Sequence, residues 1–96
     1  MVRDQLVSDN RKEILRICEA HGAINVRIFG SFARGEAGPD SDVDLLVDVG
    51  PEHSSFFPGG LMLDLEELLG RKVDIVEPKA LHWYIRDRVL KDAVSL

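Results

Sequence analysis

The chain has 96 residues, of which 17 are acidic and 12 are basic, so its formal net charge at pH 7 is −5. From this length we expect one domain, spanning residues 1–96, without a lid or a separate acceptor-binding domain. The acidic balance disfavours nucleic acid as the main partner, because binding to a phosphate backbone needs a basic face.

No segment has the pattern of a signal peptide or of a membrane span. The longest stretch without a charged residue, residues 53–63, is too short to cross a bilayer and contains Pro58 and two glycines. The single cysteine, Cys18, cannot form an internal disulfide, which is typical of a reducing compartment. We therefore expect a cytoplasmic protein that does not bind membranes, with Cys18 in its core.

The first half of the chain predicts two helices and two strands. Residues 3–20 carry apolar side chains at a period near 3.6, which predicts an amphipathic helix, with a weak point at residues 8–10 where capping residues could restart it. Residues 23–29 and 43–49 are apolar and rich in β-branched residues, which predicts strands. Between them, residues 31–34 predict a short helix followed by a turn.

The second half predicts a loop over residues 50–60, a helix over 61–69, a strand over 73–76 and a closing helix over 81–92. The resulting order predicts an α/β (α+β) fold, in which helices pack against a small mixed sheet. In the closing helix, we expect Trp83 and Tyr84 to be partly buried beside an inward-facing apolar stripe.

Three carboxylates interrupt otherwise apolar strands. Asp42 and Asp44 open the second predicted strand, and their spacing of two places both side chains on the same face. Asp74 lies within the third strand. Adjacent carboxylates repel each other, whereas Mg²⁺ would reverse this cost, since carboxylate oxygens are the ligands it prefers. If the second and third strands are neighbours, the three side chains suit a two-metal phosphoryl-transfer site.

A candidate phosphate site lies upstream, where Gly30 and Ser31 follow a strand and open a predicted helix. Glycine permits close approach of the backbone to a ligand, and the first amides of a helix are free to bind an anion. The Ser31 hydroxyl adds a donor. Each feature is weak alone, but together with the carboxylates they form a specific pattern.

Residues 30–48, G-S-F-A-R-G-E-A-G-P-D-S-D-V-D-L-L-V-D, resemble the signature of the polymerase-β-like nucleotidyltransferases, in which G-S is followed after ten residues by D-x-D. The small size and the V-D-I-V strand containing Asp74 are similar to the minimal nucleotidyltransferases. The resemblance implies the polymerase-β-like fold. It also implies that Gly30, Ser31 and Arg34 hold the triphosphate of ATP. Phe32 departs from the polar residue that many relatives carry.

The same resemblance implies that Asp42, Asp44 and Asp74 bind two Mg²⁺ ions and that Asp74 helps to deprotonate the acceptor hydroxyl. Many minimal nucleotidyltransferases are antitoxins of HEPN-domain ribonuclease toxins, which they silence by transferring AMP to a tyrosine. The resemblance therefore implies an Mg²⁺-dependent protein adenylyltransferase in a hetero-oligomer with its toxin.

Other interpretations remain open at the level of sequence. The chain could be a module that neutralises its partner by masking it, or an adenylyltransferase acting on a small molecule or an RNA end. Arg34 could pair with Glu36 or Asp40 instead of binding phosphate, Ser41 fits a turn, and Asp48 fits a solvated strand end. Basic residues late in the chain could form a solvated rim or attract ATP; they are Arg71, Lys79, Arg86, Arg88 and Lys91.

Overall fold

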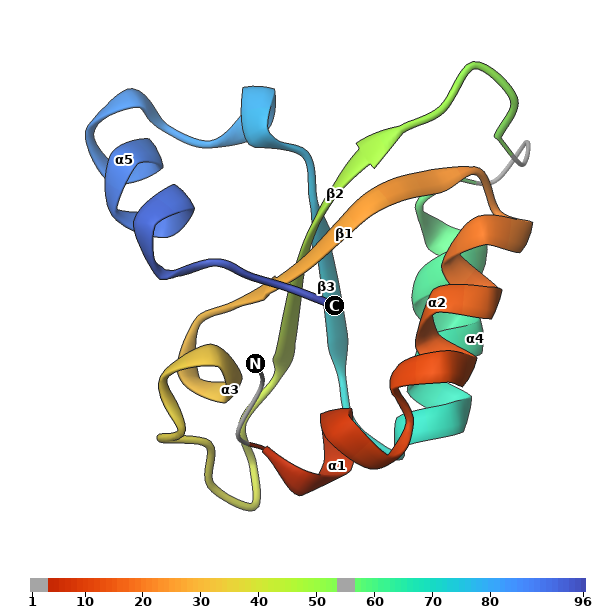
Figure 1. Ribbon diagram of the computed structural model, residues 1–96, viewed down its shortest axis with the longest axis horizontal. Coiled ribbons are helices and arrows are strands. Elements are labelled where there is room, and N and C mark those ends of the chain that lie inside the picture. The colour runs from red at the N-terminus through yellow and green to blue at the C-terminus, as the bar shows by residue number, and fades with distance from the viewer. Residues whose placement is uncertain (1–3, 54–56) are drawn as a thin grey trace.

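A four-stranded mixed sheet lies at the centre of the computed structural model, which describes residues 4–53 and 57–96 (Figure 1). The strands are β1 (Ala23–Phe29), β2 (Val43–Val49), β3 (Val73–Val76) and β4 (Val94–Ser95). They lie in the order β3-β2-β1-β4, with β1 antiparallel to β2 and β4, and β2 parallel to β3. The mixed sheet and three of its strands are confirmed with the predicted bounds. The sequence does not predict β4, because two residues are too few to show an alternation.

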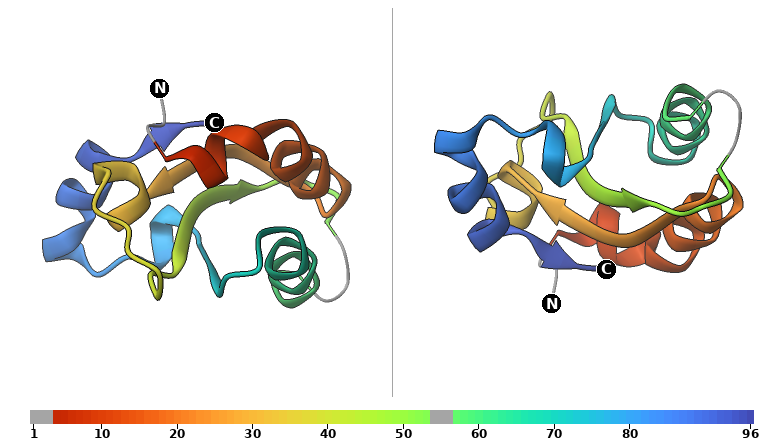
Figure 2. Two further views of the ribbon diagram at one scale, coloured as in Figure 1. Left: turned by 90° about the horizontal axis from the view of Figure 1, so that it is seen from below. Right: turned by 90° about the horizontal axis from the view of Figure 1, so that it is seen from above.

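Helices precede and follow the strands, and they gather in two groups. They are α1 (Gln5–Asp9), α2 (Arg11–Ala20), α3 (Ser31–Arg34), α4 (Gly59–Leu69) and α5 (Trp83–Asp92), with a 3₁₀ turn η1 (Pro78–Ala80). Figures 1 and 2 show α2 and α4 together at one end of the molecule, and α3 with α5 at the other. No helix in the described part of the chain is long and apolar enough to cross a membrane.

The single helix predicted over residues 3–20 divides at Asn10. The Asp4 carboxylate accepts hydrogen bonds from the amides of Leu6 and Val7 and so caps α1. The Asn10 side chain then donates to the Leu6 carbonyl at 2.8 Å, which satisfies a carbonyl at the end of α1. The break therefore falls at the predicted weak point, although the Asn10 side chain bonds back to α1 and makes no capping hydrogen bond to α2. Residues 1–3 lie outside the described residues.

The two later helices begin near, but not at, their predicted starts. The chain enters α4 at Gly59, two residues before the predicted position. The closing helix begins at Trp83 rather than at residue 81, because Pro78 opens η1 and the Leu81 backbone is extended after it, with ψ of 136°.

One face of the sheet carries the core. Helix α2 packs against β1, α4 packs against β3, and the two helices contact each other. Side chains from both helices and from alternate positions of β2 are buried together; they include Ile14, Cys18, Val43, Leu45, Val47, Leu61 and Leu65. The prediction that Cys18 is a core residue is confirmed, and burial raises the pKa of its thiol to about 11.

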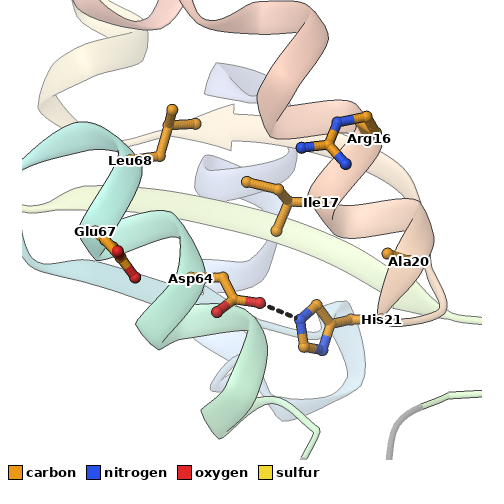
Figure 3. Close-up of a pocket in the computed structure, with 7 residues that line it drawn as sticks. All are labelled: Arg16, Ile17, Ala20, His21, Asp64, Glu67 and Leu68. Carbon is orange, nitrogen blue, oxygen red and sulfur yellow. Dashed lines mark hydrogen bonds and ion pairs between the residues drawn. The ribbon is translucent and has the colours of Figure 1, made fainter.

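A polar contact joins α2 and α4 at the edge of this core. His21, at the end of α2, lies with its Nε2 atom 2.7 Å from Oδ2 of Asp64 on α4, and Figure 3 shows the two side chains pointing toward each other. A surface cavity of about 420 Å³ lies beside this contact and is lined by residues of both helices. The contact links the two helices that cover the core face.

Helix α5 is exposed, so the expected partial burial of Trp83 and Tyr84 is wrong. The Trp83 side chain is 79% exposed and Tyr84 is 67% exposed, and within the described structure no residue of α5 is buried. The reason is geometric: α5 makes few contacts with the rest of the described structure, and its main contact with the sheet is to β1.

Candidate active site

The site is built where β1 turns into α3. Gly30 occupies this turn with φ of 75° and ψ of −153°, a conformation that residues with a side chain rarely adopt. A Cβ atom at this position would lie 2.5 Å from Oδ2 of Asp44. Gly30 is therefore needed both for the turn and for the close approach of the Asp44 carboxylate to the backbone.

Ser31 is the first residue of α3. The Gly30 carbonyl accepts hydrogen bonds from the amides of Ala33 and Arg34 at 3.1 Å each, which closes the turn. Ser31 is half-buried, and its hydroxyl makes no hydrogen bond to any other described residue. The predicted short helix is confirmed, and the Ser31 hydroxyl lies one residue from the Gly30–Asp44 contact.

The strand register brings two of the three predicted carboxylates together. Asp44 on β2 lies directly opposite Asp74 on β3 and opposite Phe29 on β1. The condition stated from the sequence, that the second and third predicted strands are neighbours, is met. Asp42 lies just before β2, and both Asp42 and Asp74 are exposed, whereas Asp44 is half-buried.

The carboxylates influence each other electrostatically. The pKa of Asp44 is raised, first by burial and then by the negative charges of Asp74 and Asp42, while the positive charge of Arg34 acts in the opposite direction. The folded protein thus concentrates negative charge around Asp44. A bound cation would stabilise the ionised form of this group.

The donor set fits a divalent cation in chemistry, but the side chains do not converge as they stand. Across residues 4–53 and 57–96, no group of three or more His, Cys, Asp or Glu side chains is close enough together to hold a metal ion. Asp42 and Asp74 are exposed, and neither makes a hydrogen bond or ion pair to another described residue. Rotation of these two side chains toward Asp44 would therefore break no existing contact.

Arg34 has a carboxylate partner within its own loop. Its Nε atom donates to Oε2 of Glu36 at 3.0 Å, and both side chains are largely exposed. The sequence-level alternative that Arg34 pairs with Glu36 or Asp40 is confirmed for Glu36. An exposed pair of this kind contributes less than about 1 kcal/mol. Breaking this pair so that Arg34 could bind phosphate would therefore cost little free energy. The phosphate role of Arg34 stays a prediction.

A cavity of about 240 Å³ adjoins Gly30. Its walls come from the end of β1, from α3 and from α5; they include Phe29, Gly30, Arg34, Ile85, Arg88, Val89 and Asp92. This volume is below the roughly 300–1,000 Å³ of pockets that enclose a whole drug-sized ligand, so the cavity would take only part of a nucleotide or acceptor. The sequence does not predict this use of α5, because no motif links it to Gly30.

Arg71 contacts the site in a way that the sequence does not predict. Its Nη1 atom donates to the carbonyls of Gly38 and Ser41, at 2.9 and 3.2 Å. Its guanidinium group lies 5.5 Å from the centre of the Phe32 ring, and Phe32 is buried. Phe32, the departure from the family pattern, is thus a core residue that supports Arg71. These contacts join residues about 30 positions apart, for which sequence spacing gives no signal.

Two other polar residues of this region have structural roles. The Ser41 hydroxyl accepts a hydrogen bond from the Gly38 amide at 2.8 Å, which confirms its predicted place in a turn. Asp48 lies at the far end of β2, where it pairs with Arg27 at 3.3 Å and accepts from Asn25 at 2.9 Å. Asp48 is thus a partnered strand residue away from the other carboxylates.

Comparison with known proteins points to one family. Residues 11–96 match the family model described as Nucleotidyltransferase domain. A Thermococcus cleftensis protein named protein adenylyltransferase MntA is 37% identical over 91 residues, which cover 95% of this chain and 89% of that protein.

Solved structures agree with this result. A structure provisionally identified as a minimal nucleotidyltransferase superimposes with a TM-score of 0.83 and 43% identity, covering 98% of each chain. A toxin–antitoxin crystal structure with AMP-PNP superimposes with a TM-score of 0.75 over 90% of this chain and 71% of that one; at 19% identity it supports the fold alone. The resemblance noted in the sequence is thereby confirmed, and the chain belongs to the nucleotidyltransferase domain family as a minimal nucleotidyltransferase with the polymerase-β-like fold.

Proposed function

We propose that the protein is an Mg²⁺-dependent adenylyltransferase that moves AMP from ATP to a hydroxyl group of a partner protein in the cytoplasm. The partner would be a HEPN-domain toxin, modified on a tyrosine, with this chain as its antitoxin in a hetero-oligomer. The observation that carries this proposal is the Asp44 carboxylate, which lies against Gly30 and opposite Asp74. The curated relative named protein adenylyltransferase MntA supports a protein as the acceptor.

The predicted ligands of Mg²⁺ are Asp42, Asp44 and Asp74. When bound, Mg²⁺ would supply positive charge for the phosphate oxygens at this edge of the sheet. The family resemblance implies two Mg²⁺ ions. Carboxylate oxygens on the neighbouring parallel strands β2 and β3 are suitable ligands for them. The raised pKa of Asp44 supports the assignment, since a site that concentrates negative charge is stabilised by a cation.

ATP would bind with its phosphates at Gly30 and Ser31. The absence of a side chain at Gly30 permits close approach, the Ser31 hydroxyl would donate to a phosphate oxygen, and the Arg34 guanidinium would exchange Glu36 for phosphate. The relative named protein adenylyltransferase MntA supports an adenine nucleotide as substrate, since an adenylyltransferase transfers AMP.

The transfer would be an in-line substitution at the α-phosphorus. The acceptor oxygen forms a bond to the α-phosphorus, the bond from that phosphorus to the bridging oxygen breaks, and pyrophosphate leaves. The acceptor proton would pass to the carboxylate of Asp74, which is exposed and therefore open to an incoming hydroxyl. The protein would act mainly by positioning the two substrates.

The surface beside the site favours a protein as acceptor. Trp83 and Tyr84 on α5 are exposed, and Ile85 of the same helix lines the cavity that adjoins Gly30. Exposed aromatic side chains of this kind commonly mark protein interfaces. The net charge of −5 suits a basic, RNA-handling partner.

A labelling experiment tests the proposal. The protein is incubated with Mg²⁺, ATP labelled at the α-phosphate and lysate of its own host, beside the Asp42→Ala/Asp44→Ala variant. We expect a labelled protein band with the wild type and none with the double variant. Mass spectrometry should then identify AMP on a tyrosine of a HEPN-domain protein. Label only in a small molecule or RNA would contradict the protein acceptor. Full neutralisation of the toxin by the double variant would favour a masking module instead.

A further inference from the structure

The backbone on both sides of Asp42 is held by two consecutive residues from another part of the chain. Before Asp42, the carbonyls of Gly38 and Ser41 accept hydrogen bonds from Nη1 of Arg71. After Asp42, the amide of Val43 donates to the carbonyl of Lys72 at 2.9 Å. Asp42 thus lies between two points of attachment, although its own side chain is exposed and unpartnered among the described residues.

Arg71 also contacts a buried aromatic side chain. Its guanidinium lies over the ring of Phe32, which is buried in the core and belongs to α3. The turn that Arg71 contacts is closed internally, since the Gly38 amide donates to the Ser41 hydroxyl and the Ser41 amide donates to the Gly38 carbonyl at 3.2 Å. Arg71 therefore links α3, the turn before Asp42 and the segment that leads into β3.

The same segment continues into the third predicted metal ligand. Arg71 and Lys72 directly precede β3, in which Asp74 lies opposite Asp44. The residues that hold Asp42 are thus two and three positions from Asp74. Because of this arrangement, the backbones at Asp42 and Asp74 cannot move relative to each other without disturbing the contacts of Arg71 and Lys72, whereas their side chains remain free to rotate.

We infer that Arg71 is a positioning residue that sets the place of Asp42 relative to Asp44 and Asp74, and so determines the affinity of the site for a divalent cation. The inference rests on the proposed function, in which these three carboxylates bind the metal. Arginine suits this role better than lysine, because its flat guanidinium can face an aromatic ring while its N–H groups contact two carbonyls.

The test compares Arg71→Lys, which keeps the positive charge, with Arg16→Lys as a matched control. Arg16 forms an exposed ion pair with Glu13 on α2, on the core side of the sheet. The probe is Mn²⁺, whose binding is followed by electron paramagnetic resonance. We expect Arg71→Lys to weaken Mn²⁺ binding about 10–100-fold, as loss of a residue that supports a metal ligand typically does. The control should bind Mn²⁺ like the wild type.

A second readout locates the effect. Amide hydrogen exchange should become faster at residues 38–43 in Arg71→Lys and stay unchanged in α2 and α4. Faster exchange at residues 38–43 with unchanged Mn²⁺ affinity would overturn the inference, because Arg71 would then be only structural. Equal weakening of Mn²⁺ binding in both variants, or no Mn²⁺ binding by the wild type, would also overturn it.

A second variant covers the case in which Arg71→Lys does not fold. Ser41→Ala removes the acceptor of the Gly38 amide in the same turn and leaves Arg71 in place. We expect it to weaken Mn²⁺ binding in the same direction by a smaller factor, and unchanged affinity would then count against the inference. If Arg71→Lys weakens Mn²⁺ binding while the wild type transfers no AMP to any acceptor, the positioning role stands and the proposed function fails.

Discussion

The two faces of β2 differ in what they contribute to the molecule. Val43, Leu45 and Val47 point to the core and are fully buried, whereas the other face carries the half-exposed Asp44 and Asp48 on either side of the buried Leu46. Successive residues of a strand point to opposite sides of the sheet, so one short segment provides both core packing and candidate chemistry. Substitutions at Asp44 and at the next residue, Leu45, should therefore affect different properties, namely AMP transfer and stability.

The largest expected effect is on transfer, in Asp44→Asn. Asparagine keeps the shape of the side chain but removes its negative charge, so the site should bind Mg²⁺ poorly and AMP transfer should fall on the order of 1,000-fold. The measurement is the rate of transfer from labelled ATP to the identified acceptor. Transfer at the wild-type rate would remove Asp44 from the reaction.

The same variant should retain its stability. The pKa of Asp44 is raised in the folded state, so its ionisation destabilises the fold, and the free energy of unfolding falls as pH rises from the unfolded-state to the folded-state pKa. At pH 7.5 without Mg²⁺, Asp44→Asn should therefore match or exceed the wild-type Tm, by no more than about 5 °C because the group is half-exposed. The difference should shrink on acidification, as wild-type Asp44 becomes protonated. A large loss of Tm would show that Asp44 also stabilises the fold, which would contradict the division of roles between the two faces of β2.

The opposite result is expected one position along, in Leu45→Ala. Leu45 is fully buried between the sheet and its helices, and removing its side chain leaves a cavity. We expect a loss of about 2–5 kcal/mol in the free energy of unfolding, measured by urea denaturation. Below its melting temperature, the folded variant should transfer AMP within about 3-fold of the wild type, since an isolated core cavity seldom reaches the reacting groups.

Gly30→Ala should affect both stability and metal binding, because Gly30 adopts a positive φ and also lies against the Asp44 carboxylate. An alanine would be strained at this positive φ, and its Cβ atom would collide with the Asp44 carboxylate. Both effects together should lower the free energy of unfolding by about 1–3 kcal/mol. The displaced Asp44 carboxylate should also weaken Mn²⁺ binding. A control is Gly59→Ala, since a Cβ at Gly59 meets no atom within 4 Å. Equal behaviour of the two variants would show that the close approach at Gly30 is unimportant.

The smallest effect is expected for Asp48→Asn, on the same face as Asp44. Asp48 is four residues further along β2, about 13 Å away, and pairs with Arg27. The pair is partly exposed, so we expect a loss below about 1 kcal/mol and unchanged transfer. If this variant lost transfer as Asp44→Asn does, the chemistry would depend on the charge of the whole face and not on the site.

Local pattern was sufficient to predict most of the fold. The strands β1, β2 and β3 begin and end as predicted, because each is a short apolar run bounded by glycine, proline or polar residues. Helix α5 was less predictable, since its apolar stripe indicates burial while Trp83 and Tyr84 are exposed. An apolar stripe shows that a helix can pack, but not how much of the protein is available to cover it.

The candidate site was predictable only in part. The spacing of Asp42 and Asp44 and the place of Asp74 follow from motif and strand pattern, and the register confirms that Asp44 and Asp74 are neighbours. The contacts of Arg71 with Gly38 and Ser41 could not be predicted, because they join a turn to a segment about 30 residues later. Such contacts depend on the completed fold and leave no periodicity in the sequence.

The path of the chain through α5 has a mechanical consequence. After β3, at one edge of the sheet, the chain passes through η1 and α5 and returns as β4, which pairs with β1 at Arg27 and Ile28 on the other edge. The segment with α5 is therefore held at its start by β3, which contains Asp74, and at its end by β4, whose partner β1 leads to Gly30. A force applied to α5 by a docked protein would be transmitted to both of these strands.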